Sequence, residues 1–329
     1  MAEKLQLNHP WLVAVWPGMG HVALNAGVYL LAKLGMTEFA EFEPGDLFDI
    51  DQVEVKDGLL QPARRPRSRF FVWTDPDKKH DLVVFVGEAQ PPVGKYSFCR
   101  RLVAVAKELG VERVFTFAAM ATRMHPEHES RVFGAATDRA NLDELKRLEL
   151  DILEDGHIGG LNGVLLGAAA EAGLQGACLL GEMPHIFAQV PFPKASHAIL
   201  DVFATVAGID LDLTELAAQA KLVEEQLGDI LARVEEQYGK GEPAGEGEGE
   251  DEGEDGEPDE GPEVAAEAEP EAARPEPKRQ STARKRIEEM FEAAARDRST
   301  AFELKQELDR LGVFAEYEDR FLDLFKKAE

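Results

Sequence analysis

The sequence predicts an α/β fold, in which a mostly parallel sheet is flanked by helices on both faces. Apolar runs of strand length alternate with helical patterns from Trp11 to Ala207. The runs are apolar throughout, as expected for strands that are buried on both faces of a sheet. Glycines stand where several predicted helices end, because a residue that accepts positive φ commonly terminates a helix; these are Gly35, Gly110 and Gly173.

The composition of the chain indicates how large its core can be and which kinds of partner its charge disfavours. The 329 residues are 44% hydrophobic, enough for one sizeable core and a small second unit. The net charge of -27 disfavours binding to nucleic acid and to anionic membranes. The chain shows neither a signal peptide nor an apolar run of about 18 residues. Cys99 and Cys178 lie in apolar stretches and are expected to be buried reduced thiols. We therefore expect a cytoplasmic protein without a nucleic-acid or membrane partner.

The first predicted unit is a strand, a glycine turn and a helix. Trp11–Trp16 is the strand and Val22–Leu34 the helix. The turn between them contains Gly18 and Gly20, which are candidates for ligand binding because free N–H groups before a helix favour an anion. The turn lacks the third glycine of a dinucleotide fingerprint and the Lys-Ser/Thr of a P-loop. A structural role, in which the glycines allow a sharp turn beneath the helix, therefore stays open.

The next region combines short strands with a basic segment. Phe39–Phe42 and Gln52–Val55 are possible strands, and Asp57-Gly58 indicates a hairpin. Arg64–Arg69 is a compact basic patch without interleaved aromatic residues, so we interpret it as an exposed loop or a subunit contact rather than a nucleic-acid site. The strand Phe70–Trp73 follows it.

The remaining core elements continue the alternation of strands and helices. Asp81–Gly87 is the strongest strand pattern, and it leads into the polar segment Glu88–Pro92. Asn141 is expected near the N-cap of its helix. Gly181–His185 is expected just past the carboxyl end of a strand. The predicted strands are Val114–Ala118, Val132–Ala136 and Ala177–Leu180, and the predicted helices are Phe98–Leu109, Asn141–Leu150, Leu161–Ala172 and Ala195–Ala207.

The C-terminal third divides into three parts. Leu213–Tyr238 predicts one long amphipathic helix, suited to a coiled coil and capped by Asp212 or Thr214, which completes a domain of residues 1–238. Residues 239–280 are rich in Gly, Glu, Pro and Ala and predict a disordered acidic linker. Residues 281–329 predict a small helical module of three short helices. Whether this module docks on the main domain, docks on a partner or forms a hairpin stays open.

Several motifs together resemble one protein family. These are WPGMGHVALNAGVYLLAKLG near the N-terminus, GEAQPP in the centre, and GLNGVLLGAA, GEMP and PKAS further on. Over about Leu12 to Tyr238 the chain resembles the proteasome assembly chaperone family, in its second-chaperone branch. The resemblance implies a core similar to nucleoside phosphorylases and related hydrolases, self-association with a trimer favoured, and chaperoning of proteasome subunits. The chain ends in Phe325-Lys-Lys-Ala-Glu329 and lacks the hydrophobic-Tyr-any tail with which such chaperones dock on proteasome rings.

Polar residues at predicted strand ends form the candidate site. The residues are Glu88, Gln90, Arg123, His125, Asn162, Glu182 and His185. Glu88 and Glu182 could form a carboxylate pair for acid–base chemistry, with His185 or His125 beside it. Gly18, Gly20, Gln90 and Asn162 are the candidates for ligand binding. A purely structural reading also holds, because glutamates after strands can cap turns. No metal or cofactor is predicted, since the chain shows no zinc spacing, nucleophile elbow or kinase signature.

Two functions follow from these observations. The favoured one is a non-enzymatic, homo-oligomeric assembly chaperone or scaffold that presents the long helix and the tethered module to client proteins. On this hypothesis, deletion of Ser281–Glu329 weakens client capture. The alternative is a protein that binds a nucleoside or a phosphorylated ligand, or a hydrolase-like enzyme, with a pocket near Gly18, Gly20, Glu88 and Glu182.

Overall fold

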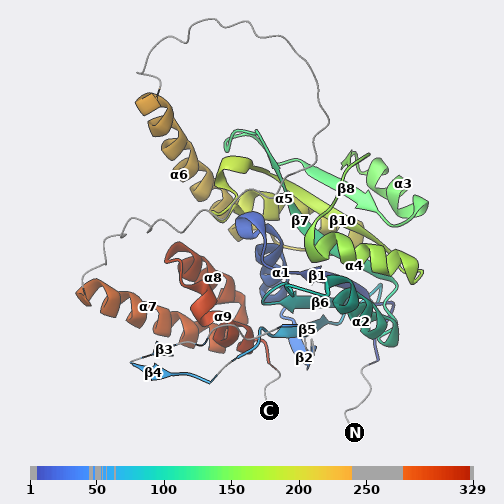
Figure 1. The fold of residues 1–329 in the computed structure, drawn as a ribbon, viewed down its shortest axis with the longest axis horizontal. Coiled ribbons are helices and arrows are strands. Elements are labelled where there is room, and N and C mark those ends of the chain that lie inside the picture. The colour runs from blue at the N-terminus through green and yellow to red at the C-terminus, as the bar shows by residue number, and fades with distance from the viewer. Residues whose placement is uncertain are drawn as a thin grey trace, which may run out of the picture.

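The computed structural model describes residues 6–43, 47–48, 53, 55–56, 58–62, 64–238 and 277–326. Eight strands form one sheet in the order β2-β5-β6-β1-β7-β10-β8-β9, with helices on both faces (Figure 1). The predicted α/β class is therefore confirmed. The strands are β1 Trp11–Val15, β2 Thr37–Glu41, β5 Ser68–Trp73, β6 Leu82–Gly87, β7 Arg113–Thr122, β8 Val132–Ala136, β9 Asp151–Ile152 and β10 Gln175–Pro184.

The sheet is parallel at its centre and mixed toward its edges. β6, β1, β7 and β10 run parallel, whereas β2 and β5 join antiparallel on one side and β8 joins β10 antiparallel on the other. Consecutive strands can be parallel only if a long crossover, usually a helix, connects them. The connections from β5 to β6 and from β7 to β8 are short and contain no helix, so the chain reverses direction there. A hairpin is observed where it was predicted, as β3 Val55–Lys56 paired with β4 Leu59–Leu60. Asp57 of the predicted Asp57-Gly58 turn lies outside the described residues.

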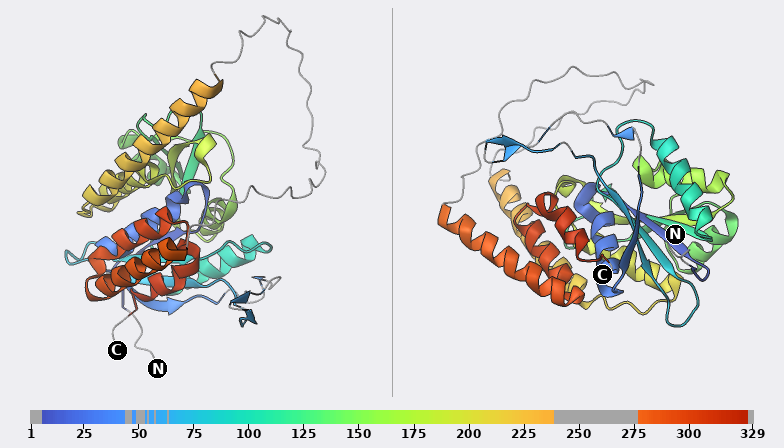
Figure 2. Two further views of the ribbon diagram at one scale, coloured as in Figure 1. Left: turned by 90° about the vertical axis from the view of Figure 1, so that its left-hand side faces the viewer. Right: turned by 90° about the horizontal axis from the view of Figure 1, so that it is seen from below.

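Helices cover both faces and enclose two apolar clusters. One face carries α1 Val22–Lys33, α5 Pro193–Ala207 and α6 Thr214–Tyr238, and the other carries α2 Lys95–Glu108 and α4 Gly160–Glu171 (Figure 2). Alternate residues of β1 point to opposite faces, so Val13 and Val15 join the first cluster while Leu12 and Ala14 join the second. Among the described residues, no helix combines the length and apolar character that crossing a bilayer requires.

Three predicted boundaries are wrong. β7 continues to Thr122 and β10 to Pro184, because the two strands pair residue by residue to their ends. The expected loop after Leu180 is therefore strand as far as Pro184. The helix expected to begin near Asn141 is α3 Arg139–Arg147, and its N-cap is Asp138, whose carboxylate accepts hydrogen bonds from two backbone N–H groups of the first turn.

The C-terminal helices pack against the core. They are α7 Pro277–Arg296, α8 Ala301–Arg310 and α9 Phe314–Asp323. Phe302 stacks edge-on against Tyr29 of α1, with 4.5 Å between ring centroids, and Phe325 contacts Phe71 of β5. Of the three placements left open, docking on the main domain is the one observed. Residues 239–276 of the predicted disordered linker lie outside the described residues, and the division into three domains stays a prediction.

Candidate functional site

A cavity of about 470 Å³ lies beside the carboxyl-terminal halves of β1 and β7 and the start of α4. Three residues predicted to bind a ligand, Gly18, Gln90 and Asn162, line it. Open α/β sheets form ligand crevices at this edge, beyond the carboxyl ends of their strands. Sequence reasoning missed other lining residues, among them Trp16, Met120 and His157. Trp16 directly follows β1 and Met120 belongs to β7, and neither carries a polar pattern that marks a site.

Gln90 shapes this cavity by joining two of its walls. Its side-chain Oε1 accepts a hydrogen bond from the Leu161 backbone N–H at 3.1 Å, and its Nε2 donates to the Pro17 carbonyl at 3.4 Å. One backbone donor at the start of α4 is thereby satisfied, which fixes this end of the helix beside the first turn. Asn162 also lines the cavity, and its buried Oδ1 makes no hydrogen bond within the described residues.

Gly20 has a structural role rather than a place in the cavity wall. Its φ is 59°, and a Cβ at this position would lie 2.8 Å from the Sδ and Cε of Met183. Its backbone N–H donates to the Ala188 carbonyl, and its carbonyl accepts from the Phe192 N–H. The backbone N–H that the phosphate-binding prediction needs is thus already engaged.

Glu182 is held in an ion pair inside β10. Its carboxylate accepts two hydrogen bonds from the Arg131 guanidinium, at 2.8 and 2.9 Å, and one from the Thr122 hydroxyl at 2.8 Å. The hydrogen bonds from Arg131 lower the pKa of Glu182. Glu182 is therefore an ionised structural acceptor, and the partner that keeps it inside the strand comes from the loop before β8.

Glu88 lies at the other side of the sheet's centre. Its Oε2 accepts hydrogen bonds from Arg64 at 2.6 Å and from the Arg67 backbone N–H at 2.7 Å. Burial raises the pKa of Glu88 to about 7. β1 and β7 lie between β6 and β10, which separates the backbones of these outer two strands by about 14 Å at ~4.8 Å per strand. The structure therefore does not bring Glu88 and Glu182 together as one carboxylate pair.

The candidate histidines lie near Glu182 and away from Glu88. The exposed His185 places Nδ1 2.8 Å from the Thr122 carbonyl. His125 lies in the β7–β8 loop, where its ring is 5.7 Å from that of His128. Arg123 and His128 line a second hollow of about 510 Å³ beside Glu182. The polar residues predicted as one site are thus divided between separate places along the sheet edge.

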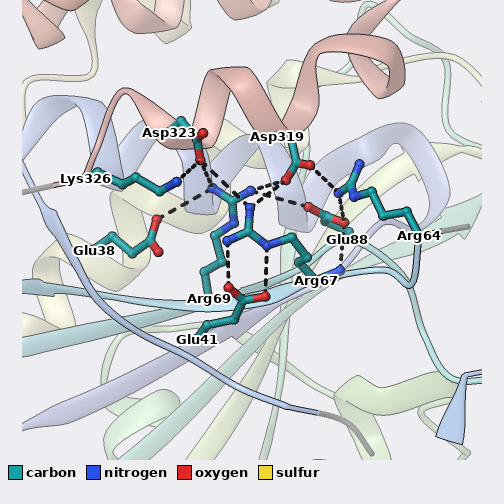
Figure 3. A network of polar contacts seen from close by, with 9 residues as sticks. All are labelled: Glu38, Glu41, Arg64, Arg67, Arg69, Glu88, Asp319, Asp323 and Lys326. Atoms are coloured by element: carbon teal, nitrogen blue, oxygen red, sulfur yellow. Dashed lines mark hydrogen bonds and ion pairs between the residues drawn. The ribbon is translucent and has the colours of Figure 1, made fainter. Parts of the chain in front are cut away.

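The basic patch is part of a polar network that the sequence did not reveal (Figure 3). Arg67 binds both carboxylate oxygens of Glu41, at 2.8 and 2.6 Å. Arg69 is fully buried and pairs with Asp319 and, at 2.8 Å, with Asp323 of α9. The prediction of an exposed loop or subunit contact is therefore wrong for Arg69, because a segment of the same chain covers it.

Asp319 and Asp323 of α9 are among the residues of this network that sequence reasoning missed. Asp319 also accepts from Arg64 at 2.8 Å and from Arg67 at 3.1 Å. The only sequence signal is their spacing of four, which places both carboxylates on one face of a helix. That spacing does not say which basic residues the face will meet.

Known proteins are similar to this one over most of its chain. A sequence model described as the PAC2 family matches residues 12–231, which ends before α7. The uncharacterized protein MJ1210 of Methanocaldococcus jannaschii is 30% identical over 247 residues, covering 72% of this chain and 89% of the relative. PbaB of Pyrococcus furiosus, described as an archaeal proteasome activator, is similar in structure with a TM-score of 0.59 and 26% identity, over 71% of this chain and 96% of PbaB.

Two further solved structures agree with this match. PbaA of Pyrococcus furiosus, described as an archaeal homolog of proteasome-assembly chaperone, has a TM-score of 0.55 and 25% identity, over 72% of this chain and 93% of PbaA. A PAC2 family protein from Streptomyces avermitilis has a TM-score of 0.57 and 25% identity, over 70% of this chain and 98% of that protein.

Proposed function

The chain belongs to the PAC2 family, and from this membership we propose that it is a non-enzymatic assembly chaperone or scaffold that binds client proteins. The observation that carries the proposal is the match over residues 12–231 together with the similarity to PbaB and PbaA. Those two proteins are described as a proteasome activator and a homolog of a proteasome-assembly chaperone. A client related to proteasome assembly is the first to test.

The state of the two candidate carboxylates supports a non-enzymatic role. Glu88 and Glu182 are each held by an arginine side chain, and two strands, β1 and β7, lie between them. A general acid–base pair needs both groups within reach of one substrate. In this chain each carboxylate instead fixes a loop or a helix to the sheet.

Helix α6 supplies a surface for self-association or for a client. Its apolar residues are spaced alternately by four and three, the repeat of a coiled-coil seam: Leu216, Ala220, Val223, Leu227, Ile230 and Val234. Leu216 and Leu227 are buried against the core, but Ile230 and Val234 are 48% and 43% exposed, where α6 extends beyond the sheet (Figure 1). We propose a homo-oligomer, with a trimer favoured.

Affinity capture of the tagged full-length chain from its native lysate, read by mass spectrometry, tests this function. The expected result is a foreign protein in near-stoichiometric amount, whose complex re-forms from the two purified components. Light scattering of the purified chain gives the oligomer number in the same preparation. Recovery of the chain alone would contradict client binding.

The cavity beside Gln90 favours a second candidate function, the binding of a nucleoside or a phosphorylated small molecule. About 470 Å³ suits a ligand of that size, and Gln90 and Asn162 are polar residues of its wall. A thermal-shift panel of nucleosides and nucleotides tests this candidate. A ligand that raises the melting temperature of the wild type, but not of Asn162→Leu, is expected. A flat response across the panel would remove the candidate.

A further inference from the structure

The surface of the core under α8 and α9 contacts these helices in three ways: by apolar packing, by pairing at a sheet edge and by complementary charge. Tyr29 and Phe71 of the core meet Phe302 and Phe325 of the C-terminal helices. Phe325 also accepts a hydrogen bond at 2.7 Å from the backbone N–H of Glu38, in the edge strand β2. Apolar packing and pairing at a sheet edge are both features of peptide-binding surfaces.

Charge complementarity is the third kind of contact. The core contributes Arg64, Arg67 and Arg69, and α9 contributes Asp319 and Asp323 (Figure 3). The two sides of these ion pairs come from distant parts of the chain. The arginines precede β6, and the aspartates follow residue 276. This surface, defined by Tyr29, Glu38, Phe71 and the three arginines, is called the docking surface below.

The contact is more polar than an ordinary core. Lys305 of α8 is fully buried and donates to Asn25 of α1 at 2.5 Å and to Asp309 at 2.6 Å. Nearly half of the buried side-chain atoms without a hydrogen-bond partner, within the described residues, belong to this contact; they include Asn25 Nδ2, Arg69 Nε, Glu88 Oε1, Asp309 Oδ1 and Glu318 Oε1. A buried polar group without a hydrogen-bond partner destabilises the docked state, and it can bind water when the contact opens. The C-terminal helices are therefore easier to release than an apolar contact of equal extent.

The covalent connection does not restrict these helices to their own core. The match to the family ends at residue 231, and the 38 residues from 239 to 276 separate α6 from α7. Fully extended, a segment of that length spans at most about 130 Å. The same contacts can therefore form with the docking surface of a neighbouring copy. Because the helices are tethered, the local concentration of each docking surface determines whether they bind their own core or that of the neighbour.

We propose that α7–α9 form an exchangeable docking element, which occupies the docking surface of a second copy of this chain and so links the two copies. The second copy is the occupant because its C-terminal helices carry the same aspartates and phenylalanines that already fit this surface. This inference goes beyond the proposed client binding and does not depend on it. Exchange of an identical element between copies is a low-cost route to assembly, since no new contact is needed.

Complementary charge reversal in the full-length chain tests the proposal. The core variant Arg64→Glu/Arg67→Glu/Arg69→Glu damages the docking surface, and the helix variant Asp319→Arg/Asp323→Arg damages the docking element. Each variant alone has mismatched charges, but a mixture restores the native pairs between two chains. The readout is hydrogen exchange at the Glu38 amide, which donates to Phe325 only when the element is docked. Nitrogen-15 labelling of the helix variant lets mass spectrometry report on that chain alone.

The expected result has three parts. Glu38 exchanges about tenfold faster in the helix variant than in the wild type. Addition of the unlabelled core variant slows this exchange again by about tenfold, whereas addition of unlabelled helix variant does not. The chain that carries all five substitutions regains protection by itself, which controls for folding. Should reversal unfold the helix variant, Asp319→Asn/Asp323→Asn replaces it in the same scheme.

Three results would overturn the proposal. Unchanged protection in the helix variant would show that the charge pairs do not hold α9. Exchange that stays fast after addition of the core variant, while the fivefold variant is protected, would restrict the element to its own core. Equal slowing by an unrelated acidic helical peptide would assign the docking surface to acidic helices in general rather than to a second copy.

Discussion

Burial raises the pKa of two carboxyl groups at the contact between the core and α9, Glu88 to about 7 and Glu318 to about 8. A carboxyl whose folded-state pKa is raised binds its proton more tightly in the folded protein than in the unfolded chain. Its contribution to stability is complete below pH ~4.5 and is lost as the pH rises through the folded-state value. The charged groups that face Glu88 are Arg64, Arg67, Arg69, Glu318 and Asp319.

The first prediction is therefore that docking of α9 weakens as the pH rises from about 5.5 to about 8.5. For Glu88 alone the change is about 3 kcal/mol at most, since one pKa unit corresponds to about 1.4 kcal/mol. Glu88→Gln should flatten the pH dependence of thermal unfolding over this range. Glu41→Gln is the matched control: Arg67 lowers the pKa of Glu41, so this carboxylate does not titrate there. An identical pH profile for Glu88→Gln and the wild type would refute the prediction.

The second prediction concerns the two glycines of the first turn. Gly20→Ala forces a side chain into positive φ and against Met183, so we expect a loss of about 1–3 kcal/mol in the free energy of unfolding. Gly18→Ala adds a Cβ where the structure leaves open space, and its φ of -167° is extended backbone. Urea unfolding of both variants makes the comparison. Equal losses at the two positions would contradict the structural role assigned to Gly20.

At the scale of an element, α6 is divided into a half that packs on the core and a half that does not. The seam that buries Leu216 and Leu227 continues without a partner at Ile230 and Val234, within the described residues. A continuous seam on a rigid helix is suited to a second helix.

The third prediction is that Ile230→Asp/Val234→Asp weakens self-association by about tenfold or more, equivalent to ~1.4 kcal/mol, while the melting temperature of the core changes little. Leu222→Asp is the matched control, because Leu222 is 61% exposed but lies off the seam. Light scattering over a dilution series gives the dissociation constants. If the seam variant and the control associate as the wild type does, another surface forms the oligomer.

At the scale of the molecule, the C-terminal helices complete the core although they lie outside the family match. Phe302, Phe321 and Phe325 belong to the same apolar cluster as Tyr29 and Phe71. Phe325 and Lys326 also cover the outer edge of β2, and an uncovered edge strand is a template for aggregation. These helices thus both stabilise the core and protect the sheet.

The fourth prediction is that deletion of residues 277–329 exposes this cluster and the edge of β2. We expect the melting temperature to fall by roughly 10 °C, from a loss of several kcal/mol, together with increased binding of a hydrophobic dye. The full-length chain with Phe321→Ala should show a smaller fall in melting temperature. This comparison separates the loss of apolar packing from the loss of the segment that covers the edge of β2. A truncated chain that melts as the full chain does would contradict the shared core.

The sequence alone was sufficient for what depends on neighbours along the chain. Continuous apolar runs identified β1 and β6, and Gly35, Gly110 and Gly173 marked helix ends that all have positive φ in the structure. Gly18, Gln90 and Asn162 line one cavity, because parallel strands bring their carboxyl ends to the same edge of a sheet. Period and turn chemistry are local properties, so they can be read without knowing the fold.

Only the tertiary structure decided which distant groups meet. Glu88 and Glu182 follow the same kind of strand pattern, yet the strand order places β1 and β7 between them. Arg69 looked like part of an exposed loop because its partner Asp319 is 250 residues away in the chain. An arginine's surroundings, and hence its burial and its charge partner, depend on how all the elements pack. That packing determines whether the basic segment is an exposed patch or, as here, the attachment site of the chain's own last helix.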